Sequence, residues 1–209
     1  TILTPLGVDT DKFHPSRRDE AMRRFWRAES SDKVLLHAGR LSVEKGTHVV
    51  LEAAPAMLED PDVHIVVAGR GGLEERVIAM DHEHERFHYM GYVTDRERLG
   101  AVFASADAYL GTGPYETFGL SILEALSAGL PVVATDEGAG TELAVKSNAG
   151  VVFRAGDPDS LVEQTRELMD RDLVFLRKRA RHFAERNGSW TATFNLMYAH
   201  YNQLLKVHR

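Results

Sequence analysis

The sequence from Asp107 to Ala128 reads DAYLGTGPYETFGLSILEALSA, which predicts a strand, a loop and a helix in that order. Ala108-Tyr109-Leu110 is apolar enough for a short buried strand, and the apolar residues after Phe118 recur at helical spacing. The glycine-rich segment between them has the composition of a turn. Such a unit places free backbone N–H groups, those of Phe118, Gly119 and Leu120, at a helix start, where they favour a bound anion.

Two carboxylates flank this predicted anion site. Glu116 ends the loop and Glu124 lies on the helix. An ionised carboxylate only accepts hydrogen bonds and repels phosphate, so both residues suit hydroxyl groups. Because Gly119 has no β-carbon, a ligand can approach the backbone closely. A sugar attached to a nucleotide diphosphate offers hydroxyls on both sides of its phosphates, and it would satisfy all of these groups.

Short β-rich runs alternate with helical runs along the chain, which is typical of an α/β fold. The expected strands are Val34–Ala38, His64–Ala68, Phe87–Met90, Ala108–Leu110, Val132–Ala134 and Val151–Phe153. The expected helices are Gly46–Leu58, Leu73–His82, Asp95–Ala104, Gly119–Ala128, Thr141–Val145, Pro158–Met169, Leu173–Arg186 and Trp190–Lys206. We therefore predict a Rossmann-like, doubly wound parallel sheet of about six strands with helices on both faces and a helical C-terminal tail. Its ligand crevice lies beyond the carboxyl ends of the strands, where the glycine-rich loops converge.

Composition bounds the class of protein. The 209 residues, 44% of them hydrophobic, can bury one core, so a single domain over residues 1–209 is expected. The net charge of −6 argues against sequence-independent nucleic-acid binding. There is no cysteine, hence neither a disulfide framework nor a thiolate zinc site. No apolar run is long enough to cross a bilayer and no signal-peptide pattern stands at the start, so we expect a cytoplasmic protein.

Four further segments, taken in order with residues 111–125, resemble the retaining glycosyltransferases of family 4 (glycosyl transferases group 1), which have the two-domain GT-B fold. They are Ala38–Gly46 (AGRLSVEKG), Val67–Gly71 (VAGRG), Gly91–Val93 (GYV) and Pro131–Thr135 (PVVAT). The agreement runs from Leu6 to Tyr198, nearly the whole chain. An ordered set of this kind is far more specific than a lone glycine motif.

The resemblance implies roles for particular residues. Arg40 and Lys45 would hold the diphosphate and stabilise the charge that develops as it leaves, Glu116 would contact the hydroxyls of the transferred sugar, and Glu124 would hold the ribose. The expected catalytic set is Arg40, Lys45 and Glu116. The expected donor-binding set is Gly39, Arg40, Lys45, Gly69, Tyr92, Val93, Glu116, Thr117, Phe118, Gly119, Leu120 and Glu124. The resemblance implies no covalent nucleophile, no metal and no cofactor beyond the nucleotide-sugar donor.

The chain also resembles only the C-terminal, donor-binding half of such enzymes. The implied partner is an N-terminal acceptor-binding domain, in the same parent chain or in a separate subunit. Residues 113–120 are most similar to members that use GDP-mannose, and a UDP-hexose is the other donor considered. Contact of the parent protein with the inner face of a membrane is compatible with these expectations.

The same residues also allow other interpretations of the function. Two glutamates could form the acid/base pair of a glycoside hydrolase, although Arg40 and Lys45 would then have no purpose. The chain could bind a nucleotide sugar without catalysing transfer. The glycines could be plain turn residues, Arg70 could simply face solvent, and the His-rich segment Asp81–His88 has no zinc-ligand spacing. In the last helix, the stripe Trp190, Phe194, Met197, Tyr198 and Tyr201 is expected to pack, with part of it exposed if the other domain covers it.

Overall fold

The computed structural model describes residues 6–207, and its centre is a parallel sheet. The strands are β1 (Lys33–Arg40), β2 (Val63–Arg70), β3 (Phe87–Tyr89), β4 (Ala108–Gly111), β5 (Val132–Thr135) and β6 (Gly150–Phe153). Their order across the sheet is β3-β2-β1-β4-β5-β6, and all the pairings are parallel. This is the doubly wound order, which reverses between β1 and β4. The predicted Rossmann-like sheet is confirmed.

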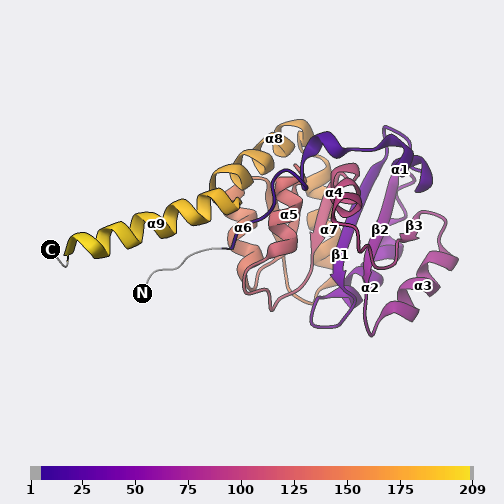
Figure 1. Cartoon of the computed structure of the whole chain (residues 1–209). Coiled ribbons are helices and arrows are strands. Elements are labelled where there is room, and N and C mark those ends of the chain that lie inside the picture. The colour runs from indigo at the N-terminus through magenta and orange to yellow at the C-terminus, as the bar shows by residue number, and fades with distance from the viewer. Residues whose placement is uncertain (1–5, 208–209) are drawn as a thin grey trace.

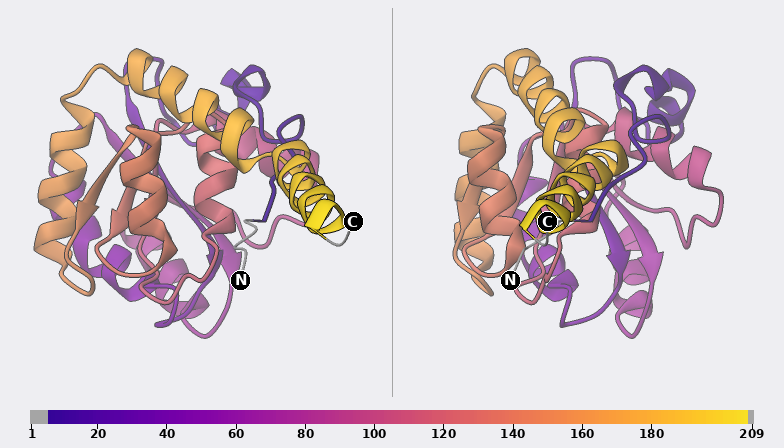
Figure 2. Two further views of the ribbon diagram at one scale, coloured as in Figure 1. Left: turned by 90° about the vertical axis from the view of Figure 1, so that its left-hand side faces the viewer. Right: turned by 60° about the vertical axis from the view of Figure 1, so that its left-hand side comes forward.

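Helices cover both faces of the sheet (Figures 1 and 2). On one face lie α2 (Thr47–Met57), α3 (Glu74–Glu83) and α7 (Pro158–Met169); on the other lie α1 (Glu20–Phe25), α4 (Arg96–Ser105), α5 (Leu120–Ser127) and α6 (Ala139–Ser147). The helix α8 (Leu173–Phe183) packs on α5. Successive residues of β1 enter opposite cores, Leu35 on the α2 face and Leu36 on the α5 face. β1 is therefore buried on both faces, which explains why it contains consecutive apolar residues and no alternation of apolar and polar ones.

Aspartate side chains cap the starts of α1, α4, α7 and α8. Asp157 caps α7 by accepting a 3.0 Å hydrogen bond from Ser160 N, and Pro158 occupies the first helical position, so this helix has the predicted bounds. α6 is two residues longer at each end than predicted. Instead of continuing to Arg186, α8 ends at Phe183 and passes into a π-helical turn over Ala184–Gly188. α1 and a 3₁₀ turn over Pro15–Arg17 were not predicted.

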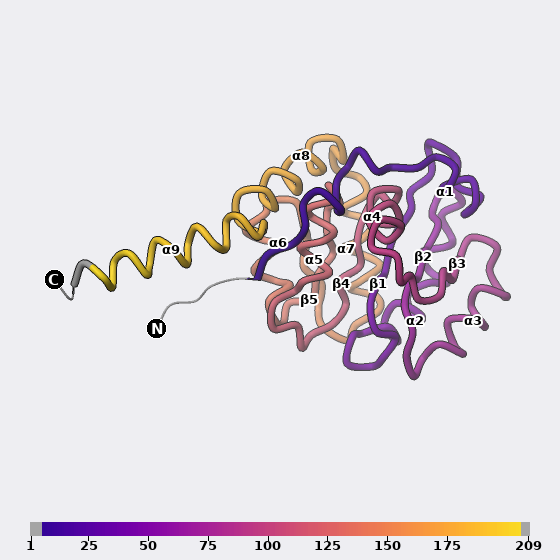
Figure 3. Tube along the Cα trace, viewed as in Figure 1, coloured from indigo at the N-terminus to yellow at the C-terminus, as the bar shows by residue number. Residues whose placement is uncertain are grey.

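The last helix, α9 (Trp190–Val207), projects away from the body of the domain (Figures 1 and 3). The rings of Trp190 and Phe194 stack at 5.8 Å but are 44% and 48% exposed, and Tyr198 and Tyr201 are exposed as well. Its apolar stripe therefore does not pack into the core of this chain. Helical periodicity shows that one face is apolar and does not show what covers it.

A buried ion pair joins the N-terminal segment to the sheet at the edge where β1 and β4 begin. Arg23 is fully buried, and its guanidinium lies 2.7 Å from Asp107 Oδ2, which also accepts a 2.9 Å hydrogen bond from Val34 N. Arg18 and Arg177 approach the other carboxylate oxygen of Asp107. Because a buried charge without a partner is costly, this cluster fixes α1 against the sheet.

Candidate functional site

Two adjoining cavities lie at the carboxyl ends of β1 and β4, where the strand order reverses. The first, of about 390 Å³, is bordered by α4 and is called the α4 cavity; the second, of about 330 Å³, is bordered by the start of α5 and is called the α5 cavity. Ala38, Gly39, Ser121 and Glu124 line both, so the two form one crevice. A doubly wound sheet is expected to bind its ligand at this place.

The structure brings every predicted site residue to this crevice. Those in the α4 cavity are Gly39, Arg40, Gly69, Tyr92, Val93 and Glu124. Those in the α5 cavity are Gly39, Lys45, Glu116, Thr117, Phe118, Gly119, Leu120 and Glu124. Sequence reasoning missed Arg96, Leu99, Phe103 and Ser121, and it left Arg70 as a solvent-facing alternative although Arg70 borders the α4 cavity. Ser121 lies within the segment 111–125 but was given no role, whereas Arg96, Leu99 and Phe103 lie outside the motifs.

Lys45 and Glu116 form an ion pair inside the α5 cavity. Lys45 Nζ lies 2.7 Å from Glu116 Oε1, with 28% and 18% of the two side chains exposed. The backbone on both sides is fixed: Thr112 Oγ1 donates to Lys45 O at 3.1 Å, and Glu116 O accepts from Ala139 N at 2.8 Å. The pair thus places one cation and one carboxylate at defined positions before the start of α5.

The start of α5 offers unpaired donors to the same cavity. Gly119 adopts the left-handed conformation (φ 65°) that turns the loop into the helix. Within residues 6–207, the backbone N–H groups of Phe118, Gly119 and Leu120 donate no hydrogen bond. Phe118 and Leu120 are partly exposed at the rim. Free donors at a helix start next to a lysine form a favourable environment for an anion.

Two glycines at the ends of β1 and β2 shape the backbone that lines the crevice. A β-carbon at Gly39 (φ 153°) would meet no atom within 4 Å, so the backbone there is bare to the crevice. A β-carbon at Gly69 would instead stand 1.8 Å from Gly39 O. Gly69 therefore allows the ends of β1 and β2 to lie side by side, and Gly39 leaves open space for a ligand.

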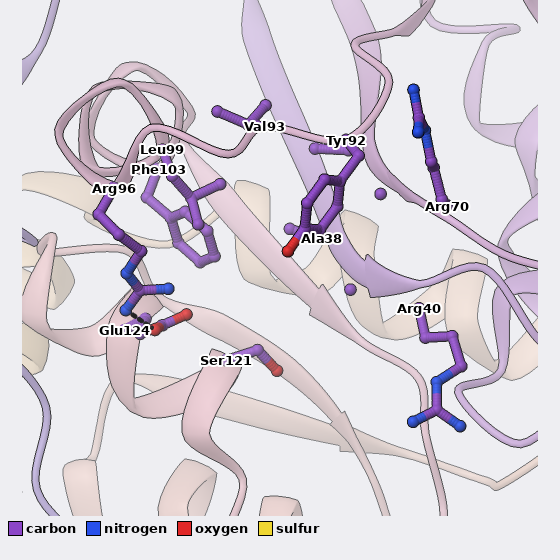
Figure 4. Close-up of a pocket in the computed structure, with 13 residues that line it drawn as sticks. Ala38, Arg40, Arg70, Tyr92, Val93, Arg96, Leu99, Phe103, Ser121 and Glu124 are labelled. Atoms are coloured by element: carbon purple, nitrogen blue, oxygen red, sulfur yellow. Dashed lines mark hydrogen bonds and ion pairs between the residues drawn. The ribbon is translucent and has the colours of Figure 1, made fainter.

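Glu124 extends from α5 into the crevice and meets Arg96 from α4. Figure 4 shows their side chains pointing toward one another, with Arg40 and Arg70 across the cavity. Arg96 Nη2 lies 2.6 Å from Glu124 Oε1, and the Glu124 side chain is only 15% exposed. Burial raises the pKa of the Glu124 carboxyl, while the Arg96 guanidinium partly offsets that rise. Arg40, by contrast, is 67% exposed, and its ion-pair contact among residues 6–207 is a loose 3.8 Å approach to Glu44.

Two buried polar side chains, His37 and Tyr109, line the α5 cavity and form hydrogen bonds with other groups of the protein. His37 connects Leu110 O, at 3.0 Å from Nδ1, with Thr47 Oγ1, at 3.1 Å from Nε2. Tyr109 donates to Ala38 O at 2.8 Å. Burial lowers the pKa of His37 and raises that of Tyr109, so both stay neutral near pH 7. His37 is thus a neutral, internally hydrogen-bonded side chain of β1.

In the part of the chain that the structure describes, no group of three or more His, Asp or Glu side chains could hold a metal ion. From the His-rich segment, His88 Nε2 lies 3.3 Å from His64 Nδ1, and Asp81 accepts a hydrogen bond from Tyr89 N. Those side chains therefore have partners near the far strand β3, away from the crevice.

Comparison with known proteins identifies the family. Residues 18–189 match the family model described as Glycosyl transferases group 1. The chain belongs to the glycosyl transferases group 1 family. A relative from Mycobacterium tuberculosis, named GDP-mannose-dependent alpha-(1-6)-phosphatidylinositol dimannoside mannosyltransferase, is 34% identical over 192 residues. That match covers 88% of this chain and 48% of the relative, so this group 1 chain spans about half the length of that protein.

Solved structures share the fold. The Anabaena protein HepE in complex with UDP superposes with a TM-score of 0.77 at 20% identity, covering 94% of this chain and 56% of HepE. The C-terminal domain of the group 1 family protein LpcC from Francisella tularensis superposes with a TM-score of 0.67 at 23% identity. The match covers 87% of this chain and 94% of the LpcC domain. The fold of this group 1 chain is thus one Rossmann-like half of the GT-B architecture. Among residues 6–207, every helix is too short or too polar to cross a membrane.

Proposed function

We propose that this chain is the donor-binding domain of a retaining glycosyltransferase, which transfers a hexosyl group from a nucleotide diphosphate sugar to an acceptor hydroxyl. One observation carries the proposal: at the point where the strand order reverses, Lys45 and free N–H groups at the start of α5 share a cavity with Glu116 and Glu124. The donors and the cation suit a diphosphate, and the two carboxylates suit the hydroxyls on either side of it.

Each residue then has one task. Lys45 and the start of α5 hold the diphosphate, together with Arg40, whose exposed side chain is free to turn toward it. Glu116 accepts from the sugar hydroxyls and Glu124 from the ribose. The backbone at Gly39 and Gly69 and the side chains of Tyr92 and Val93 border the space for the base and ribose.

The chemical step needs no protein nucleophile. The bond between the anomeric carbon and the diphosphate oxygen breaks, and the acceptor oxygen bonds to the same face of that carbon. The acceptor proton passes to an oxygen of the leaving diphosphate. Lys45 and Arg40 stabilise the charge on that diphosphate, so we propose that added metal is unnecessary.

GDP-mannose is the first donor to test, because the Mycobacterium tuberculosis relative is named for its dependence on it. The acceptor would be bound by another domain, since this chain spans about half of that relative. The same observation favours a second candidate function, in which this chain alone binds the donor without transferring it.

Calorimetry of the chain against GDP, UDP and ADP and their sugar conjugates, without metal, tests the proposal. Preference for one nucleotide, lost in Lys45→Ala and Glu124→Ala, supports it. Absence of binding to all of them overturns it. Transfer after addition of an acceptor-binding half separates a split enzyme from a binding module, and hydrolysis of a glycoside without any nucleotide would favour the hydrolase instead.

A further inference from the structure

Arg96 holds the carboxylate of Glu124 from one side only. Its Nη2 lies 2.6 Å from Oε1, whereas within residues 6–207 Oε2 accepts no hydrogen bond. Both residues line the α4 cavity. The carboxylate thus keeps one oxygen for a ligand while the other is engaged.

The guanidinium is itself held in place. Arg96 Cζ lies 4.9 Å from the centroid of the Phe13 ring, a stacking distance for a cation on an aromatic face. Phe13 is fully buried and packs edge-on against Phe103 at 5.3 Å. Half of the Arg96 side chain is exposed, yet its charged end rests between a core ring and a carboxylate. An ordinary surface ion pair lacks this support.

We propose that Arg96 is a positioning residue for the donor: by holding Oε1 of Glu124, it presents Oε2 to the ribose hydroxyls of a nucleoside diphosphate. The inference rests on the proposed function and adds a residue that the family motifs do not contain. Arg96 acts through Glu124 and need not touch the nucleotide.

The charge state of Glu124 supports the same assignment. A ribose hydroxyl donates its proton, so it needs the ionised carboxylate. Burial favours the protonated form and raises the pKa of Glu124, while Arg96 counteracts the rise. The other charged or titratable groups around the crevice are Arg40, Arg70, Lys45, Glu116, His37, Tyr92 and Tyr109. Without Arg96 the pKa of Glu124 rises further, and ribose binding is lost at a higher pH.

The test compares GDP with 2′,3′-dideoxy-GDP by calorimetry between about pH 6 and pH 8, using UDP or ADP pairs instead if the chain prefers them. Arg96→Ala is expected to weaken GDP binding about tenfold, with a larger loss at the lower pH than at the higher, and to leave dideoxy-GDP binding unaffected. Arg96→Lys keeps a cation and should restore most of the affinity. Arg76→Ala removes an exposed arginine of α3 outside both cavities and controls for net charge.

The outcomes separate this inference from the proposed function. If Arg96→Ala weakens both ligands equally, or strengthens GDP, Arg96 does not act through the ribose, and the proposed function stands. If the unmodified chain binds GDP and dideoxy-GDP equally, the ribose assignment of Glu124 fails, and the inference with it. Absence of all nucleotide binding overturns both.

Thermal melting of each variant verifies folding. Phe13→Leu removes the aromatic ring beneath the guanidinium but no charge, so it should weaken GDP binding less than Arg96→Ala does.

Discussion

Lys45 Nζ and Glu116 Oε1 lie 2.7 Å apart, although the residues are 71 positions apart in the sequence. The two opposite charges neutralise each other in the α5 cavity. A diphosphate would compete with Glu116 for the ammonium, and a sugar hydroxyl would take over the freed carboxylate oxygen. In the proposed function, the pair would therefore couple the binding of the phosphate to the binding of the sugar.

Removing the cation tests the phosphate contact. Lys45→Ala is expected to weaken nucleotide diphosphate binding by about 1.5–3 kcal/mol, the range for a hydrogen bond to a charged group. Isothermal calorimetry at fixed ionic strength measures the change. Lys146→Ala serves as the control, because Lys146 is exposed and lies outside the crevice. Unchanged affinity in Lys45→Ala would show that the diphosphate binds elsewhere.

Neutralising the carboxylate should separate sugar from phosphate. Glu116→Gln keeps the shape of the side chain but releases Lys45 and removes a charge that repels the diphosphate. The bare nucleotide should bind as well as before or more tightly, while the conjugated sugar loses about 1–2 kcal/mol of its additional affinity. Competition experiments with the nucleotide and its sugar conjugate give both quantities. Equal effects on the two ligands would contradict the assignment of Glu116 to the sugar.

Much of this architecture could be predicted from the sequence because the informative residues follow strands. The loops after β1, β2 and β4 carry the motif residues, and parallel strands bring such loops to one edge. Arg96 was missed because a cation in the first turn of a helix looks like any exposed charge. The proposed role of Arg96 rests on its contacts with Glu124, 28 positions away, and with the Phe13 ring, and neither contact is visible in the sequence.

Two other features could not be predicted, for different reasons. α1 has only six residues, EAMRRF, too few for a recognisable pattern of apolar residues. The burial of Arg23 depends on Asp107, which is distant in the sequence and directly precedes β4. α9 has a clear apolar stripe, but periodicity gives no information about the partner that covers it. The expected exposure of part of the stripe is confirmed, whereas the expected packing of its aromatic side chains into the core of this chain was wrong.

Acid should weaken the fold through His88. Burial, with His64 alongside, lowers the pKa of His88 to about 4, below the value near 6.5 of an unfolded chain. The unfolded state therefore binds more protons between these values, so stability is full above about pH 6.5 and is lost as the pH falls toward 4. Partial exposure limits the effect to about 1–2 kcal/mol. Urea unfolding between pH 7 and pH 4.5 gives the free energy of unfolding as a function of pH. This free energy should fall less steeply with pH in His88→Gln than in the unmodified chain. An identical pH dependence in both would refute His88 as the origin.

Breaking the buried pair at the opposite edge of the sheet should cost stability without affecting the site. Asp107→Asn leaves the charge of Arg23 uncompensated, for which about 3–5 kcal/mol of unfolding free energy is expected. Lys33→Ala removes a half-exposed, 3.7 Å contact with Asp60 on the same side of the domain and should cost less than about 1 kcal/mol. Chemical denaturation gives both values. Nucleotide affinity should stay constant in the folded fraction of each variant.

The adjacent glycines at the ends of β1 and β2 should respond differently to the same added methyl group. In Gly39→Ala the β-carbon meets no protein atom and projects into the crevice, so the cost to folding is the backbone strain of about 1–3 kcal/mol. The main loss should be nucleotide affinity. In Gly69→Ala the β-carbon would stand 1.8 Å from Gly39 O, so the strands must separate and the domain loses more stability than in Gly39→Ala. Melting temperature and nucleotide affinity, measured together on both variants, separate the two effects. Gly39→Ala with native affinity would mean that no ligand approaches the end of β1.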